Sequence, residues 1–460
     1  MNPKSKTESP KPTHKATLLE KFAWGAGGMS ESLVNSIYAL AFPIYSIGLG
    51  VSPALIGIAK AAPRLVDALT DPIMGNISDN ARTRWGRRRP FIFIGAILIG
   101  IIYPIIWLPN PGWSEMMLFT WLTALTIFFF LGFTIWNIPW SAMGMELSDD
   151  YNDRTKVQVA RMIFATIAGL GNAWVYKLCF LFNSDEIIGV RYTGFIIGSI
   201  IMVGAILSAF FIKEWRHVDK QMPIRLLTSL KMTLSNRPFL LLCGTIVAFA
   251  IGLVMVDPLL LYVNIYHVFD GDRSAASTIM GISGTCGVII SVLMLPIGGK
   301  LSEKFGKRNA AFCALTLMII GKGSQYLLVT PDNPYLQLIC RIIYQPGLML
   351  MWALIPSMIA DVCDLDELEN GNRREASFSS VFQWIWKLGA TIAMALSGIL
   401  ISLAGASVSS PDDLLSYNVV FRLRLILAIV PVIFAIIAMV LLWRYPLTHK
   451  RVNEIKEQIK

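Results

Sequence analysis

The sequence predicts an all-α membrane protein with twelve transmembrane helices, and three observations lead to that fold class. Mean hydropathy is +0.58, and 15% of the 460 residues are charged, against about a quarter in soluble domains. Apolar runs recur from near the start of the chain to near its end, and many are long enough to cross about 30 Å of hydrocarbon as a helix. Basic residues gather in every second connection between these runs.

The apolar runs set the expected order of the helices. Backbone groups in lipid must bond internally, so helices are expected rather than open strands. The longest basic connection, 214–237, falls at the midpoint of the chain and leaves six runs on each side. We therefore expect bundles over 22–213 and 238–443, with tails at 1–21 and 444–460. The expected helices cover 22–47, 54–79, 90–108, 115–145, 157–182, 191–213, 238–266, 275–301, 309–328, 335–362, 376–404 and 420–443.

The charge pattern predicts topology and argues against a nucleic-acid partner. The formal net charge is +10, but one set of connections carries almost no basic residue; the connection near 267–274 holds only Arg273. This is the positive-inside pattern, and it predicts that both termini of a cell-membrane protein (inner or plasma membrane) are cytoplasmic. The other set of connections contains Arg82, Arg84, Arg87, Arg88, Arg89, Arg154, Lys156, Lys213, Arg216, Lys220, Arg225, Lys231, Arg237, Lys304, Lys307, Arg308, Arg373 and Arg374.

The residues that enzymes and metal centres need are not grouped in this chain. It has no HExxH motif and no Ser/His or Cys/His pairing near the middle of an apolar run. The six cysteines stand apart, with no CxxC pair, which favours small buried hydrophobic residues over metal ligands or disulfides. We expect a monomer without catalytic activity.

A motif at the end of the second expected helix recurs at the end of the eighth. Gly75-x-x-x-Asp79 precedes a Trp-Gly-Arg-Arg-Arg cluster, and Gly299-x-x-x-Glu303 precedes a Phe-Gly-Lys-Arg cluster. The glycine of each helix would allow close helix approach, and acid and base would pair at the cytoplasmic helix ends. Basic loops that merely follow the positive-inside rule are the alternative. The predicted cytoplasmic gate comprises Gly75, Asp79, Gly86, Arg87, Arg88, Glu303, Gly306, Lys307 and Arg308.

The second expected helix carries three charges on one face. Arg64, Asp67 and Asp71 follow at i, i+3 and i+7, and each costs roughly 2.5–3.5 kcal/mol inside a membrane on insertion scales. Two carboxylates close together repel unless a proton or a metal cation lies between them. A structural salt bridge is the alternative, but one arginine cannot neutralise both acids. The pattern favours a cation site, to which Thr70 and Thr134 could add oxygen ligands.

The duplicated motif, the midpoint loop and the twelve expected helices resemble the major facilitator superfamily, in which two pseudo-symmetric six-helix bundles surround a central cavity. The segment RLVDALTDPIMGNISDNARTRWGRRRPF is similar to the signature of the glycoside–pentoside–hexuronide:cation symporters, whose best-known member is the melibiose permease. WGAGGMSES, FTIWNIPWSAMGMEL, VARMIFATIAG and ADVCDLDELENGNRREASFSSVFQWIWKLGA extend that resemblance over most of the chain.

The resemblance implies a secondary active symporter that carries a sugar with sodium, lithium or a proton by alternating access. It implies that a small-molecule sugar and the coupling cation are the ligands, with no other cofactor. Asp67, Asp71, Thr70 and Thr134 match the family's cation site, and Arg161 and Lys387 match its sugar-binding residues. The duplicated loops would latch the outward-facing state from the cytoplasmic side.

Two positions depart from the melibiose permease pattern, because its two sugar-binding acids align with Ser32 and Asn137. With Arg64, Arg161 and Lys387 at the cavity, the lost negative charge suggests an anionic sugar such as a hexuronide, although Glu31 could offset one cation. A lipid-like substrate such as lysophospholipid is the alternative. Weaker candidates for substrate contact, each with packing between helices as its alternative, are Gln383, Trp136, Trp140, Asn35 and Tyr38. Helix pairing or a position near the membrane edge is expected for Asp257, Lys322, Arg341 and Asp361.

Overall fold

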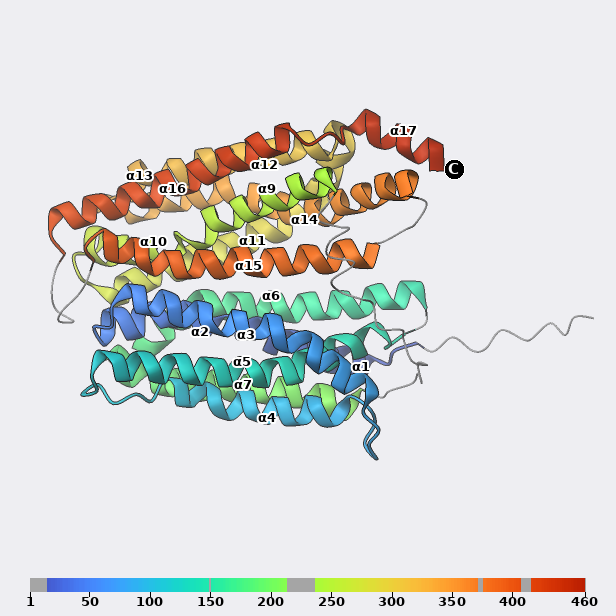
Figure 1. Cartoon of the computed structure of the whole chain (residues 1–460). Helices are drawn as coiled ribbons and strands as arrows, with labels where there is room; N and C mark the ends of the chain where they lie inside the picture. The colour runs from blue at the N-terminus through green and yellow to red at the C-terminus, as the bar shows by residue number, and fades with distance from the viewer. Residues whose placement is uncertain (1–14, 149, 213–235, 371–374, 407–414, 460) are drawn as a thin grey trace, which may run out of the picture.

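The computed structural model describes residues 15–148, 150–212, 236–370, 375–406 and 415–459, and over these ranges the chain is helical. The first half of the chain forms α1 (Leu18–Leu33), α2 (Ser36–Ala41), η1 (Phe42–Gly48), α3 (Pro53–Asn80), α4 (Arg89–Ile106), α5 (Glu115–Met145), α6 (Tyr151–Phe182) and α7 (Glu186–Phe211). Figure 1 shows these helices lying together as one bundle, below those of the second half.

The second half forms a bundle of the same kind. It comprises α9 (Arg237–Val254), α10 (Asp257–Val263), η2 (Asn264–Val268), α11 (Arg273–Phe305), α12 (Lys307–Gly323), α13 (Gln325–Leu328), η3 (Pro334–Leu336), α14 (Gln337–Asn370), α15 (Glu375–Leu403), α16 (Tyr417–Trp443) and α17 (His449–Ile459). The predicted central loop 214–237 and the basic pair at 373–374 lie almost wholly outside the described residues.

Ten helices in the described part of the chain are long and apolar enough to cross a membrane, and they coincide with ten of the twelve expected spans. The other two expected spans are the first two. The first, 22–47, is divided among α1, α2 and η1, and the second, 54–79, is the charge-bearing α3. The count of twelve and the cytoplasmic position of the termini stay predictions.

The first and seventh expected helices are interrupted at matching places. α1 ends at Leu33 and the chain resumes as α2 and a π-helical segment, η1; α9 ends at Val254 and resumes as α10 and a second π-helical segment, η2. π-helical segments often occur at functional sites. The internal repeat of this chain therefore extends from the basic loops to the interrupted helices.

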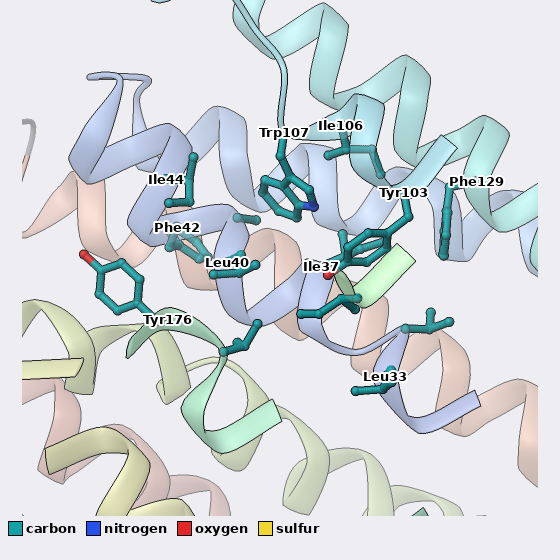
Figure 2. Close-up of a cluster of buried hydrophobic side chains, with 14 of the residues drawn as sticks. Leu33, Ile37, Leu40, Phe42, Ile44, Tyr103, Ile106, Trp107, Phe129 and Tyr176 are labelled. Carbon is teal, nitrogen blue, oxygen red and sulfur yellow. The ribbon is translucent and has the colours of Figure 1, made fainter. Parts of the chain in front are cut away.

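Aromatic packing holds the interrupted first helix in place. Figure 2 shows side chains of α2 and η1 packed against Tyr103 of α4 and Trp107, the residue that follows α4, both of which are fully buried. The hydroxyl groups of Ser36 and Tyr103 share a hydrogen bond of 2.5 Å. A buried hydroxyl needs such a partner, so this contact fixes the position of α2 relative to α4.

The two bundles meet at one end of the molecule. We call the end that carries the α3–α4 and α11–α12 turns the basic-loop end; it is the end at which α17 lies in Figure 1. At the other end, called the opposite end, the backbone N–H of Ala54 donates to Ser402 Oγ at 3.1 Å, and Tyr262 donates to Ser46 Oγ at 2.8 Å. These contacts join the N-terminal bundle to the C-terminal bundle.

Candidate functional site

The structure brings the two predicted acids together around one hydroxyl group. Asp67 and Asp71 lie on α3 between Pro63 and Pro72, which both stand inside this helix. Thr134 of α5 donates to Asp71 Oδ1 at 3.0 Å and lies 3.5 Å from Asp67 Oδ1. The carboxylates thus converge, and they offer the hard oxygen ligands that suit sodium.

Thr70 does not join this cluster. Its hydroxyl donates to the Val66 carbonyl at 3.0 Å, the usual bond of a threonine inside a helix. No group of three or more His, Cys, Asp or Glu side chains arranged to hold a metal occurs in the described ranges. Any cation here would rely on two carboxylates and a hydroxyl group.

Each acid also has a positively charged partner. Arg64 Nη1 lies 3.8 Å from Asp67 Oδ2, and Lys387 of α15 forms an ion pair with Asp71 Oδ2. Arg64 is the counter-charge that lies on the same helix face as the two acids in the sequence. Lys387 supplies a second counter-charge from the other bundle. The side chains in this structure are therefore arranged as salt bridges, which was the alternative to a cation site.

The candidate substrate-binding residues Glu31 and Arg161 form one unit. Arg161 donates to Glu31 Oε2 from Nε at 3.0 Å and to Oε1 from Nη2 at 2.7 Å. The guanidinium also lies over the Trp140 ring, 5.3 Å from its centroid. Both charged side chains remain about a third exposed, at 34% for Arg161 and 27% for Glu31, so they can reach a ligand. Glu31 offsets Arg161, as the sequence allowed.

The two tryptophans of α5 pack between helices. Trp136 and Trp140 are fully buried and stack with centroids 4.9 Å apart, and Trp24 stacks on Trp140 at 4.1 Å. A Cβ on Gly27 would lie 2.4 Å from Trp140 Nε1, so this helix contact depends on glycine. Their burial favours the packing role that the sequence left open for both rings.

The remaining candidates for substrate contact lie in different surroundings. Asn137 is half-buried, and its Oδ1 has no partner among the described residues. Tyr38 stacks on Phe130 and lies under Arg64, with the guanidinium 5.1 Å from the ring centroid. Asn35 is exposed at the break after α1, Ser32 donates to the Ala165 carbonyl at 3.2 Å, and Gln383 is exposed one turn before Lys387.

Asp257 forms no ion pair between helices with a described residue, which was one of the two roles expected for it. It is exposed at the start of α10, at the break that mirrors the one after α1, and it makes no hydrogen bond or ion pair with a described residue. Lys60 of α3 and Arg341 of α14 interact with it electrostatically. Asp361 does pair between helices, as expected, because Lys307 donates to both of its oxygens at 2.7 Å.

The predicted gate residues form ion pairs inside each bundle. Arg88 lies 2.8 Å from Asp79 and 2.9 Å from Glu146, a residue of the α5 end that the motif did not include. Arg87 lies 3.5 Å from Glu146. In the other bundle, Lys307 pairs with Asp361. These contacts show acid and base paired at the helix ends, although Glu146 and Asp361 replace part of the expected set.

The other gate residues have different roles. Gly86 and Gly306 have φ of 108° and 77°, a left-handed conformation that favours glycine in a turn. Gly75 is not required for close helix approach, because an added Cβ would meet only Ile138 Cγ2 at 3.7 Å. Arg308 donates to the Trp443 carbonyl at 2.5 Å, and Glu303 is exposed without an ion pair to any described residue.

Comparisons with known proteins cover nearly the whole chain. The family model described as MFS/sugar transport protein matches residues 24–449. An uncharacterized symporter of Bacillus subtilis (strain 168) is 26% identical, over 97% of this chain and 95% of its own. The glucuronide carrier protein homolog of Escherichia coli (strain K12) is 24% identical, over 93% and 91%. The sodium-dependent lysophosphatidylcholine symporter 1 of Xenopus tropicalis is 21% identical, over 100% and 93%.

Solved structures share the fold at low sequence identity. A bacterial homolog of the human lysosomal transporter Spinster, in an inward-facing conformation, has a TM-score of 0.68 at 15% identity, covering 96% of this chain and 97% of that chain. A D-xylose-proton symporter has a TM-score of 0.64 at 14% identity, covering 94% and 98%. The chain therefore has the all-helical major facilitator fold.

Proposed function

Because the chain belongs to the MFS/sugar transport protein family, which consists of multi-pass membrane transporters and not enzymes, we propose that it imports a sugar or glycoside together with sodium or a proton by alternating access. One observation carries this proposal: Asp71 of the two-carboxylate cluster is paired with Lys387 of the opposite bundle. The group that would bind the cation therefore also forms an ion pair between the two bundles.

This pairing provides a coupling mechanism. A cation that bound between Asp67 and Asp71 would neutralise the Asp71 carboxylate in place of Lys387. Lys387 would then be released toward the substrate, which it could bind through hydroxyl groups. Because linkage is reciprocal, a sugar held by Lys387 would strengthen cation binding at Asp67 and Asp71 by the same factor.

The charges around the cluster bear on the choice of substrate. Arg64, Arg161 and Lys387 each lie beside an acid in this structure, so excess positive charge no longer favours a hexuronide over a neutral glycoside. The resemblance to the glucuronide carrier homolog is the remaining support for a hexuronide. Asp257, unpaired at the break of the seventh expected helix, would accept hydrogen bonds from sugar hydroxyls on the C-terminal side, and discontinuous helices often line transporter binding sites.

Uptake into proteoliposomes tests the function. Labelled glucuronides, glucosides and xylosides would be offered under an imposed sodium or proton gradient, with Asp71→Asn as the coupling variant. We expect uphill uptake of one of them that depends on one cation, and loss of that uptake in the variant. Uptake unchanged by Asp71→Asn would reduce the acids to a structural pair.

A second candidate function follows from the lysophosphatidylcholine symporter among the relatives. The same proteoliposomes would therefore be given labelled lysophosphatidylcholine under the same gradients. Cation-dependent uptake of that lipid, with no uptake of any sugar, would replace the sugar in the proposal and leave the coupling site unchanged.

A further inference from the structure

A cavity lies away from the candidate transport site, at the basic-loop end. It has a volume of about 300 Å³, the lower end of the range for small-molecule sites. It lies where the α3–α4 turn and the start of α4 meet the end of α7. Its lining comprises Arg84, Trp85, Arg89, Phe93, Ala209 and Phe210.

The two arginines of this cavity are held differently. Arg89 donates to the carbonyls of Ala209 and Phe210 at 2.7 and 2.8 Å, which fixes its guanidinium at the end of α7. Arg84 is exposed and makes no bond to a described residue. A planar guanidinium binds phosphate oxygens in pairs, so the cavity presents one free anion-binding group beside a fixed one.

Three of the other lining side chains are aromatic, and two of these are exposed. Trp85 and Phe210 are 64% and 56% exposed, and Phe93 packs edge-on against both rings, with centroids 6.2 and 5.6 Å away. Tryptophan is enriched at the interface between membrane and water. Exposed apolar side chains continue from the cavity along α4 and α7, namely Ile94, Leu98, Ile101, Ile200 and Val203.

The C-terminal bundle shows which part of this arrangement is structural. There Arg308 donates to the carbonyl of Trp443, the last residue of α16, and lies one turn before Phe312. An arginine bonded to the end of the last transmembrane helix of the bundle, α7 in one and α16 in the other, is thus a feature of both bundles, and it complements the negative end of the helix dipole. The free Arg84 is what the N-terminal cavity adds.

We propose that this cavity binds the phosphate headgroup of an anionic phospholipid. Arg84 and Arg89 hold the phosphate, Trp85 marks the interface, and the acyl chains lie over the exposed side chains of α4 and α7. Basic pockets between helices at the cytoplasmic side of a membrane are suited to such headgroups. The proposal does not depend on which solute is transported.

Native mass spectrometry of the full-length protein with phosphatidylglycerol and phosphatidylcholine tests the site. The variant is Arg84→Gln, and its control is Arg82→Gln, which removes the same charge from the same turn at an exposed residue outside the cavity. We expect Arg84→Gln to weaken phosphatidylglycerol binding about tenfold, the size of one charge-assisted contact, and Arg82→Gln to change it less than about twofold. Binding of phosphatidylcholine should be the same in all three proteins.

If both variants lost the same affinity for phosphatidylglycerol, the proposal would be overturned, because the lipid would then be attracted by the basic surface as a whole and not by the cavity. An unchanged affinity in Arg84→Gln would do the same. Inorganic phosphate at millimolar concentration is the second arm of the experiment. If it displaced phosphatidylglycerol completely, the cavity would be a site for free anions and the lipid assignment would fail.

Discussion

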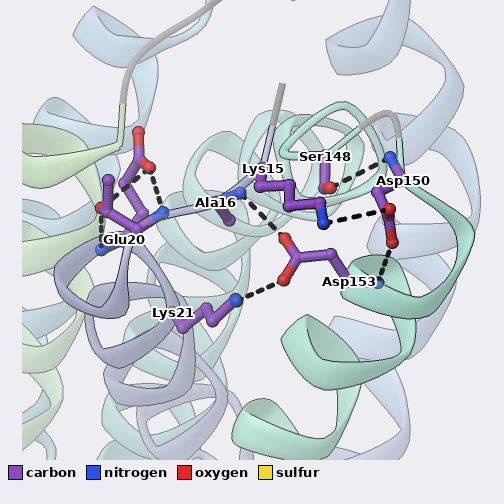
Figure 3. A network of polar contacts seen from close by, with 8 residues as sticks. Lys15, Ala16, Glu20, Lys21, Ser148, Asp150 and Asp153 are labelled. Carbon is purple, nitrogen blue, oxygen red and sulfur yellow. Dashed lines mark hydrogen bonds and ion pairs between the residues drawn. The ribbon is translucent and has the colours of Figure 1, made fainter. Parts of the chain in front are cut away.

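The two ends of this protein use ion pairs in different ways. At the opposite end they join the bundles: Arg273 of α11 lies 2.5 Å from Glu186 of α7, which also accepts a hydrogen bond from Tyr176 of α6. At the basic-loop end the ion pairs among the described residues stay inside one bundle, as with Arg88 and Glu146 or Lys307 and Asp361. Figure 3 shows the same for the N-terminal segment, where Lys21 and the Ala16 backbone bond to Asp153 of α6.

This difference indicates that the opposite end of the molecule is closed. The contacts between the bundles at that end must break when it opens, whereas ion pairs within one bundle can persist through the transport cycle. The ion pair with Glu186 also explains why Arg273 is tolerated in a connection where the positive-inside rule predicts few basic residues. The predicted latch between the basic loops would belong to the other state and stays a prediction.

The largest effect is expected where the two backbones touch. A Cβ on Gly398 of α15 would lie 2.0 Å from the Pro53 carbonyl oxygen and 2.9 Å from the Gly57 nitrogen, and these backbone atoms cannot move aside without separating the helices. We expect Gly398→Ala to prevent closure of the opposite end. Hydrogen exchange over residues 50–60 should then rise, and cation-driven uptake should be lost.

Gly75→Ala is the matched control for that substitution. It makes the same chemical change on α3, where the added carbon meets only Ile138 at 3.7 Å, so hydrogen exchange over residues 50–60 should stay near the value of the unsubstituted protein. If Gly398→Ala behaved like this control, the close approach of α3 and α15 would not hold the opposite end shut.

The next effect concerns the ion pair across the bundles. Glu186 is only 4% exposed, and Arg273→Gln would leave its charge buried without a full partner, at a cost of roughly 3–5 kcal/mol. We expect the closed opposite end to be depopulated, with faster hydrogen exchange around residues 186–190. Replacing both residues, as Glu186→Gln with Arg273→Gln, should restore part of the protection, because no uncompensated charge remains.

Glu115→Gln serves as the control for this pair. Glu115 lies at the same end and accepts a hydrogen bond from the Ser52 backbone at 2.8 Å, a contact within one bundle. Its loss should leave exchange at 186–190 unchanged. A double variant no better protected than Arg273→Gln would show that the pair does not hold the bundles together.

The sequence predicts much of this fold, and its failures have physical reasons. Ten spans follow from apolar length. The break after α9, at Met255–Val256, comes just before Pro258, the second residue of α10, and a proline has no N–H with which to continue the helix. The break after α1, at Val34–Asn35, has no strong helix breaker beside it; we attribute it to packing such as the contact between Ser36 and Tyr103, which residue type alone does not reveal. Short-range spacing in turn predicts that Asp67 and Asp71 converge.

The spacing of residues along one helix cannot predict partners that are distant in the sequence. Lys387 is 316 positions from Asp71, and only the docking of α15 on α3 brings them together. Glu146 was not predicted as an acidic partner at the basic-loop end, and Asp361 was expected to pair between helices but not as the partner of Lys307, because both acids lie outside the duplicated motif. Charge alone suggested an anionic substrate, whereas the folded chain places an acid beside each of the three cations concerned.

A smaller effect is expected from the buried pair at the basic-loop end. Asp361 is 5% exposed at its side chain, and Asp361→Asn would leave Lys307 with a weaker partner inside the C-terminal bundle. We expect a loss of about 3 kcal/mol in the free energy of unfolding, measured as a lower thermal midpoint in detergent. Hydrogen exchange at the opposite end should stay unchanged, and an increase there would show that this pair, too, connects the two bundles.

The smallest effect is expected for Asp79→Asn. The Asp79 side chain is 53% exposed, and its partner Arg88 keeps a second acid, Glu146, at 2.9 Å; an exposed pair of this kind contributes about 1 kcal/mol or less. Thermal stability should therefore hardly change. If Asp79 instead latches the two basic loops in the other state, the variant should raise exchange at the basic-loop end and leave the affinity for the transported substrate nearly the same. An equal loss of substrate affinity in every state would contradict that latch, and Asp79 would then act only inside its own bundle.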